Sequence, residues 1–333
     1  MSNNRVQWID WCKGIGILLV LLGHTLRTDL SLVYIYGFHM PLFFFLSGQV
    51  CNEKKYNWNT FLRSRFNTLI LPYIVFYLLT WIYWLFVERS FRPISLEWWQ
   101  PLVGMIYGAQ WHGLMDHNGI LWFLPCLFTT EVLFFATSRI DTKWKQAIVV
   151  AVLACSGLMI KSNLPWCLNI AMVTLQFFWL GNISRELLLG KEAQTRISWS
   201  CLLLGVALGA LYLQLCPVWN NHINIATCGY GNILGFEILS FFGIMGLVLL
   251  CKSLITNRIG GGQLGRNTLI VFALHQPILR IVRFVGTKVI GNFPVETDIL
   301  YALAADAIVL ICLVPLIWVW NRYAQPLLKK IYI

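Results

Sequence analysis

Three ionisable residues, Asp10, Lys13 and His24, lie along one apolar segment near the start of the sequence. At about 100° per helical residue, the eleven positions from Lys13 to His24 place both side chains within about 20° of one stripe, about 16 Å apart along the axis. Asp10 falls within about 40° of the same stripe. Ionisable side chains are costly in lipid and normally face a protein interior or a wet cavity. Because imidazole exchanges protons near pH 7, the stripe predicts a site for acid–base chemistry.

The composition of the chain predicts that this segment is one of many membrane helices. The 333 residues are 58% hydrophobic and 12% charged, and the mean hydropathy is +0.67, which is typical of a polytopic membrane protein. Apolar stretches long enough to cross a bilayer recur without the alternation of barrel strands. We therefore expect an all-α fold of about ten transmembrane helices, at 8–26, 31–50, 68–87, 119–137, 146–161, 167–184, 197–216, 232–251, 266–285 and 300–320.

The charge distribution predicts the orientation of these helices. The net charge is +11, but the basic residues are spread over short loops between spans and form no single patch, which argues against a nucleic-acid partner. Seventeen of the 25 Lys and Arg residues fall on one side if both termini are cytoplasmic. The first helix is interrupted by Lys13 and His24 and has no small-residue cleavage site after it, so we expect it to be retained. Residues 1–333 are interpreted as one integral-membrane domain.

Further candidate catalytic residues fall inside later predicted helices. His39 lies in the second, Glu131 in the fourth and His275 in the ninth, where His275 is followed by Gln276-Pro277. A proline can kink a helix and free backbone groups to line a cavity. Each of these side chains could instead satisfy a neighbouring helix through a hydrogen bond. Both interpretations remain open.

Two arginines are predicted in the inner loop that precedes the third helix. Arg63 and Arg65 could grip the phosphates of a nucleotide-like donor with their planar guanidinium groups. The alternative is that they only orient the helix by the positive-inside rule.

The longest interval between spans, residues 88–118, is rich in aromatic residues and predicts an interfacial cap. Trp98, Trp99, Trp111 and Trp122 would lie at headgroup level, and their flat faces could also bind a sugar acceptor. Interfacial anchoring is the simpler interpretation.

The remaining histidines and the cysteines give weaker signals. His112, His117 and His222 fall in outer loops, where a solvated or interfacial imidazole is expected. No CxxC motif or Cys/His cluster predicts a metal site, and the ten cysteines are expected to pack mainly as small apolar residues. Cys216 and Cys228 flank one outer loop and could pair in an oxidising compartment.

Several of these motifs together resemble membrane acyltransferase family 3, and most closely its fucose 4-O-acetylase-like bacterial branch. The first 75 residues carry most of the likeness, and the later motifs extend it over nearly the whole chain. The motifs are Trp8-Ile9-Asp10 with His24, Phe38-His39-Met40-Pro41-Leu42-Phe43-Phe44-Phe45-Leu46-Ser47-Gly48, Arg63 and Arg65 with Leu71-Pro72-Tyr73, Leu121-Trp122-Phe123-Leu124, Phe177-Phe178-Trp179-Leu180-Gly181 and Ala273-Leu274-His275.

The resemblance implies transfer of an acyl group, usually acetyl from acetyl-CoA, to a hydroxyl of a cell-surface glycan or its lipid-linked precursor. It implies a basic residue upstream of an essential histidine, here Lys13 and His24. Many relatives have Arg at the position of Lys13, and they often space the two loop arginines three apart, whereas Arg63 and Arg65 are two apart. The donor acetyl-CoA would be a substrate, and no bound cofactor or metal is expected.

The sequence thus predicts an O-acyltransferase of the bacterial inner membrane. His24 would act as general base or carry the acyl group, between the first, second and ninth helices, with Asp10 or Glu131 setting its tautomer. Lys13, Arg63 and Arg65 would hold the donor, and Trp122 the acceptor. The alternative is a proton-coupled carrier or flippase for a glycan or small metabolite, in which the same ionisable residues form a proton pathway. An inverted pair of Gly/Pro-broken helices would favour that alternative, but the sequence shows no such pair.

Overall fold

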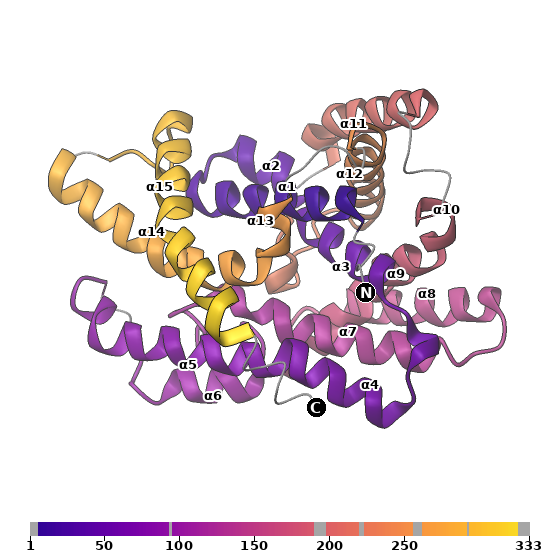
Figure 1. The fold of residues 1–333 in the computed structure, drawn as a ribbon, viewed down its shortest axis with the longest axis horizontal. Coiled ribbons are helices and arrows are strands. Elements are labelled where there is room, and N and C mark those ends of the chain that lie inside the picture. Colours follow the sequence, from indigo (N-terminus) through magenta and orange to yellow (C-terminus); the bar gives the residue numbers. More distant parts are fainter. Residues whose placement is uncertain are drawn as a thin grey trace. The chain divides into compact units, whose positions relative to one another are not determined.

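The computed structural model is built from α-helices, joined by short 3-10 and π turns (Figure 1). It describes residues 6–92, 95–189, 198–219, 223–255, 262–291 and 293–325. No strand occurs among these residues, and a single isolated bridge pairs Asn224 with Gly229. The predicted all-α fold is therefore confirmed for the part of the chain that the structure describes.

The chain forms two compact units, and each is described by itself. The first comprises residues 1–51, 177–224 and 229–269. Its helices are α1 (Gln7–Thr25), α2 (Asp29–Tyr36), α3 (His39–Val50), α10 (Arg185–Leu189), α11 (Trp199–Trp219), α12 (Ile233–Leu254) and α13 (Gln263–Arg266).

The second unit comprises residues 52–176, 225–228 and 270–333. Its helices are α4 (Trp58–Arg65), α5 (Leu71–Phe86), α6 (Gln100–Tyr107), α7 (Phe123–Thr137), α8 (Lys143–Met159) and α15 (Ile299–Val319). Two further helices, α9 (Leu168–Ile183) and α14 (Thr268–Ile290), begin in one unit and end in the other.

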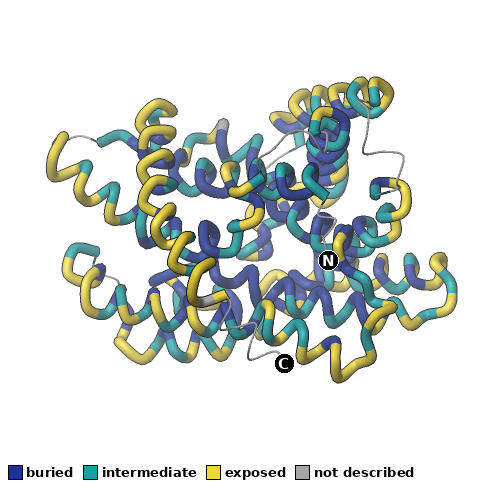
Figure 2. The backbone as a smooth tube through the Cα atoms, in the orientation of Figure 1, coloured by how far each residue is buried: buried dark blue, intermediate teal, exposed yellow. Residues whose placement is uncertain are grey.

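Helices occur at all ten predicted positions, and eight helical segments of the described residues are long and apolar enough to span a membrane. Many of their apolar side chains are exposed, as expected of surfaces that face lipid. Exposed positions predominate along α11 and α15 in Figure 2. The chain is thus a multi-pass membrane protein, while the count of ten spans and the cytoplasmic termini stay predictions.

The predicted helix 31–50 is two helices, because the chain breaks at Gly37 and Phe38 between α2 and α3. Pro41 has no N–H, and its ring would clash with the carbonyl oxygen of residue 37 in a continuous helix. The Gly37 carbonyl instead accepts a hydrogen bond from the Ser240 hydroxyl at 2.9 Å. A side chain at Gly37 would also meet the hydroxyl of Tyr212, at 2.8 Å from an added Cβ. The break places His39 at the first residue of α3.

The predicted helix 68–87 begins ten residues earlier than expected, at Trp58. The Asn57 side chain accepts from the Thr60 backbone N–H while the Thr60 hydroxyl accepts from the Asn57 N–H, which forms a capping box. A π turn at Phe66–Ile70 then joins α4 to α5, where Pro72 removes one backbone donor. Arg63 and Arg65 therefore lie on a helix, and the prediction that they lie in a loop is wrong.

Two glycines allow α3 and the end of α9 to pack backbone to backbone in the first unit. A Cβ added at Gly48 would lie 2.0 Å from the Phe178 carbonyl oxygen, and one at Gly181 would lie 2.1 Å from that of Phe45. Real Cβ atoms do not approach so closely, so only glycine fits at either position. This interface fixes α3, and with it His39, against α9.

Residues 88–118 do more than cap the membrane surface. Trp98, Trp99 and Trp111 are exposed as expected, but Leu96, Met115 and other members of this interval are buried in the second unit. Trp122 is only 5% exposed, so its indole packs inside the second unit, while its depth in the membrane stays a prediction. Trp122 is the last residue of the 3-10 turn Gly119–Trp122 and directly precedes α7.

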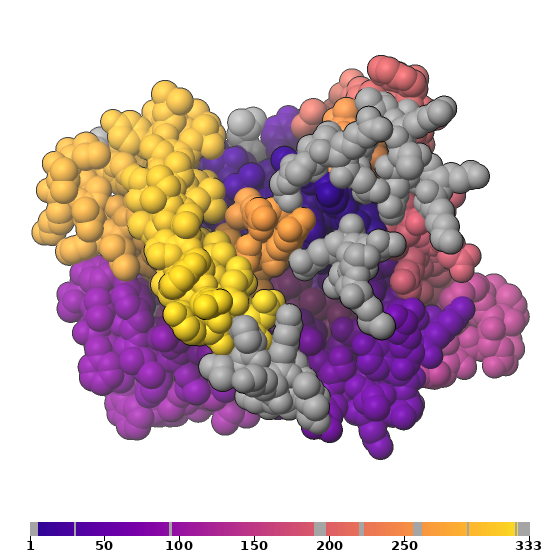
Figure 3. Space-filling model, viewed as in Figure 1, coloured from indigo at the N-terminus to yellow at the C-terminus, as the bar shows by residue number. Residues whose placement is uncertain are grey.

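Aromatic stacking and free thiols complete the core. The C-terminal helix α15 is yellow in Figure 3. Trp320, the residue after this helix, stacks on Phe76 of α5 with ring centres 4.9 Å apart. All ten cysteines are free thiols, including Cys216 and Cys228. In the second unit the Cys228 thiol donates to the Asn163 side chain and accepts from Asn169. These bonds give Cys228 a structural role.

Candidate functional site

The predicted stripe of ionisable residues lies on one continuous helix, α1. Asp10 is buried and belongs to the first turn, whereas Lys13 and His24 are half-buried. His24 lies in the last turn, where the partial negative charge of the helix end stabilises an imidazolium. The helix thus offers a proton acceptor at one end and a lysine about 16 Å away towards the other.

His24 and His39 are linked through one tyrosine of the first unit. The Tyr36 hydroxyl donates to the carbonyl oxygen of Gly23, directly before His24, at 3.1 Å. The Tyr36 ring meets the His39 ring edge-on, with centres 5.0 Å apart. His39 is buried, and its Nδ1 lies 2.8 Å from the Ile35 carbonyl oxygen. Because a carbonyl only accepts, Nδ1 carries the proton and a neutral His39 has Nε2 as its basic nitrogen.

Asp10 does not orient His24. Its Oδ2 atom pairs with Nε of Arg266 at 3.2 Å. Fourteen residues of one helix separate Asp10 from His24, which corresponds to about 21 Å along the axis. The prediction that Asp10 sets the tautomer of His24 is therefore wrong, because a shared stripe aligns two residues without bringing them into contact.

In the second unit the structure joins Arg65 to Glu131. Nε of Arg65 lies 2.7 Å from Oε2 of Glu131, and both side chains are largely buried. The guanidinium also stacks over the rings of Tyr56 and Phe61, at 5.7 and 5.1 Å. Arg63, two residues away, projects from a different side of α4 and is exposed. The two guanidiniums are thus not presented together for one phosphate.

His275 is fully buried on α14, and its proton position is fixed in the same way as that of His39. Its Nδ1 lies 3.0 Å from the Val271 and 2.9 Å from the Phe272 carbonyl oxygen, so Nδ1 is the donor. Pro277 leaves the Ala273 carbonyl without its helical partner, and the Asn118 side chain donates to this oxygen at 2.9 Å. A backbone carbonyl is thus released at Ala273, but a cavity lined by such groups stays a prediction. A joint site of His24, His39 and His275 stays a prediction.

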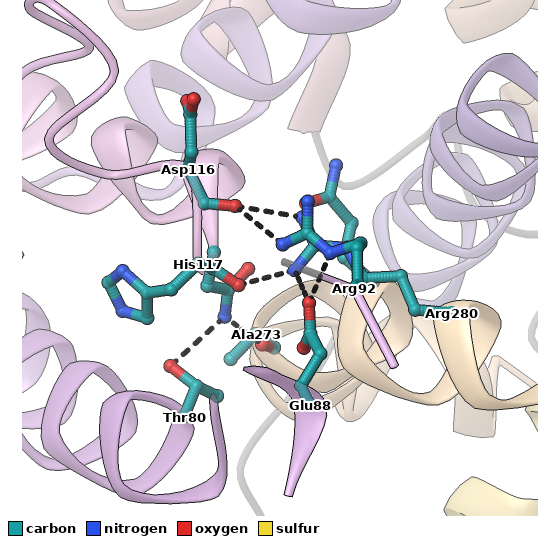
Figure 4. A network of polar contacts seen from close by, with 9 residues as sticks. Thr80, Glu88, Arg92, Asp116, His117, Ala273 and Arg280 are labelled. Carbon is teal, nitrogen blue, oxygen red and sulfur yellow. Dashed lines mark hydrogen bonds and ion pairs between the residues drawn. The ribbon is translucent and has the colours of Figure 1, made fainter. Parts of the chain in front are cut away.

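Sequence reasoning missed a buried charge cluster, shown in Figure 4. Glu88 is fully buried, and its Oε1 atom accepts from Nε of Arg92 at 2.5 Å and from Nη1 of Arg280 at 3.1 Å. Arg280 also donates to the backbone carbonyls of Asp116 and His117, and Arg92 donates to that of Asp116. The spacing of Glu88 and Arg92, four apart, was the only signal in the sequence.

This Glu88 cluster fastens the 113–118 loop to α14. Arg280 on α14 also bonds to Gln276, the residue that follows His275, at 3.2 Å. The Asn118 side chain reaches Ala273 on the same helix. The Glu88 cluster and Asn118 therefore attach the 113–118 loop to α14 at positions before and after His275.

His117 is buried and not solvated as expected for an outer loop, whereas His112 is exposed as predicted. In Figure 4 the His117 ring points away from the two arginines, and it meets the Tyr77 ring edge-on at 4.5 Å. Burial, helped by the charge of Arg280, lowers the pKa of His117 to about 3. His222 lies outside the described residues.

The buried His117 predicts a loss of stability in acid. Between its folded pKa of about 3 and an unfolded value of about 6.5, only the unfolded chain binds the proton, so stability declines as the pH falls below about 6.5. The expected cost at pH 5 is about 2 kcal/mol. In detergent, the melting temperature of wild-type protein should fall more between pH 7 and pH 5 than that of His117→Phe. His112→Asn, at an exposed position with a left-handed backbone, should behave like wild type. Equal pH slopes for His117→Phe and wild type would contradict the assignment.

These features define a multi-pass membrane protein with titratable groups held inside its helical units. The sequence of residues 6–320 matches the model of the acyltransferase domain of family 3. The chain therefore belongs to acyltransferase family 3, which favours the enzyme over the carrier that the sequence left open.

One curated relative is similar over part of its length. Nodulation protein NolL of Sinorhizobium fredii (strain NBRC 101917 / NGR234) is 28% identical over an alignment of 200 residues, which covers 54% of this chain and 49% of NolL. The match therefore spans about half the length of the relative. No solved structure gives a significant match.

Proposed function

We propose that the protein is an O-acetyltransferase that moves the acetyl group of acetyl-CoA to a hydroxyl of a cell-surface polysaccharide or lipid-linked sugar, in the cytoplasmic membrane of a bacterium. One observation carries the proposal: a half-buried histidine, His24, at the end of an apolar helix in a chain of acyltransferase family 3. A hydroxyl is a weak nucleophile, and a positioned imidazole is the group most often used to activate it.

The reaction needs one proton acceptor and one leaving group. His24 takes the proton of the acceptor hydroxyl as its oxygen attacks the thioester carbonyl. The carbon–sulfur bond then breaks, the acetyl ester of the sugar forms, and the CoA thiolate leaves and takes up the proton from the imidazolium. The helix end at His24 favours the imidazolium that exists between these two events.

Two residues near His24, Tyr36 and His39, would shape its surroundings. The Tyr36 hydroxyl holds the last turn of α1 through Gly23, and His39 lies against the Tyr36 ring. His39 is therefore a candidate second imidazole, with Nε2 as the nitrogen available to a substrate. Trp122, which is 5% exposed, would contact the acceptor.

The donor would be held by cationic residues. Lys13 lies on the same helix as His24, towards its other end. Arg63 is exposed on α4, whereas Arg65 is held by Glu131. We expect Arg63 to bind a phosphate by itself, with the Arg65–Glu131 pair stabilising the junction between α4 and the π turn.

The test follows label from donor to acceptor. Membranes with and without the protein are supplied with acetyl-CoA labelled in the acetyl group, and the glycan fraction is counted. Label should appear only where the protein is present, and mild alkali should release it as acetate, because the expected product is an ester. Equal labelling of both membranes, or label that resists alkali, would contradict the proposal.

A further inference from the structure

A second cation lies beside the Lys13 end of α1, and the predicted donor site did not include it. Arg266 on α13 pairs with Asp10, with Nε and Oδ2 3.2 Å apart. Asp10 and Lys13 are three residues apart on one helix, so their side chains are neighbours. Arg266 and Lys13 therefore flank a single carboxylate. The three groups together carry a net charge of +1.

The backbone fixes α13 on α1 at this place. A Cβ added at Gly265 would lie 1.7 Å from the Asp10 carbonyl oxygen, so the two chains touch with no room for a side chain. Gly262 precedes α13 in the left-handed conformation, at φ +68°, and lies against the Asp10 side chain. Gly14 faces the backbone nitrogen of Gly265. Figure 1 shows α13 beside α1. Arg266 is thus held at a defined position relative to Lys13.

Only some of the N–H donors of the Arg266 guanidinium are engaged in hydrogen bonds. It contacts Asp10 through Nε, and within the described residues its two terminal NH₂ groups form no further hydrogen bond. The side chain is 31% exposed, whereas that of Asp10 is 9% exposed. A buried carboxylate that holds one edge of a guanidinium and leaves the other edge open is suited to present that edge to an anion.

We propose that Arg266, oriented by Asp10, forms with Lys13 a binding site for the phosphate groups of the CoA part of the donor. This inference rests on the proposed function and names a new residue for its donor site. Arg266 binds the phosphate, and Asp10 is a positioning residue that acts through Arg266. The planar fork of Arg266 supplies the bidentate contact that Lys13, a point charge, cannot make.

The test compares donor affinity among variants of the full-length protein in detergent. CoA without an acyl group is the binding probe, read as the rise in melting temperature over each variant's own unliganded value. Acetyl transfer gives KM and kcat. Arg266→Gln should raise the KM for acetyl-CoA about tenfold or more, since it removes charge-assisted hydrogen bonds, with kcat changed little. Its stabilisation by CoA should fall accordingly.

Three further variants separate binding from structure. Arg266→Lys keeps the charge and loses the fork, so it should recover part of the affinity. Asp10→Asn should raise KM less than Arg266→Gln, because Arg266 is present but less well oriented. Arg322→Ala, an exposed basic residue of the second unit, should match wild type.

The outcomes are distinct. If wild-type protein binds CoA and transfers acetyl groups, and Arg266→Gln leaves KM and CoA stabilisation unchanged, the inference is wrong and the proposed function stands. An equal loss of kcat in Arg266→Gln and Asp10→Asn with unchanged KM would make the pair purely structural. If wild-type protein neither binds CoA nor uses acetyl-CoA, both proposals are overturned.

Discussion

Membranes that carry His24→Ala are expected to transfer acetyl groups about 10²- to 10⁴-fold more slowly than wild-type membranes, because the acceptor hydroxyl loses its general base. His24 lies in the last turn of α1 and is half-buried, so its replacement should leave the helix and the Tyr36–Gly23 bond in place. The measurement is the initial rate of label transfer from acetyl-CoA into glycan, at matched protein abundance. Added imidazole should restore part of the lost rate.

The control for this comparison is His112→Asn, which removes an exposed histidine of the second unit and should keep the wild-type rate. A His24→Ala rate within a few-fold of wild type would refute the role of general base. A slow rate accompanied by low abundance in the membrane would instead assign His24 to packing, since loss of a base alone does not unfold the helix.

Glu88→Ala is expected to destabilise the protein by about 3–5 kcal/mol, because it leaves two guanidiniums in a largely buried site without their carboxylate. The loss should be seen as a lower melting temperature in detergent and as lower accumulation in the membrane. Glu88→Gln should lose less, since its amide oxygen can still accept one hydrogen bond.

The matched control is Glu97→Gln, an exposed glutamate of the same interval, which should melt like wild type. Combining Glu88→Gln with Arg92→Gln should recover part of the loss, because it removes one of the two unpaired charges. If Glu88→Ala melts at the temperature of Glu97→Gln, the cluster does not stabilise the fold.

Helix positions could be predicted from the sequence because hydropathy reports which segments enter lipid. What hydropathy does not report is local backbone geometry. The break at Gly37 depends on Pro41 and on partners from α11 and α12, Tyr212 and Ser240. The early start at Trp58 depends on a polar cap, which a search for apolar residues passes over.

The candidate site was predictable to the extent that it lies on one helix. Lys13 and His24 share a face of α1 as their spacing indicated, but the partner of Asp10 is 256 residues away in the chain. The pairing of Arg65 with Glu131 likewise depends on which helices pack together. Neither contact follows from a regular spacing of residues, so it cannot be predicted from a single sequence.

The π turn at Phe66–Ile70 sets the rotational phase between α4 and α5. Such a turn holds one residue more than an α-helical turn. If the same residues, with none deleted, were wound as a regular α-helix, α4 would rotate by about 100° relative to α5. Arg65 would then face away from Glu131, although every residue of the ion pair is retained. The length of this turn, as much as the identity of its neighbours, thus determines which cation reaches the buried acid.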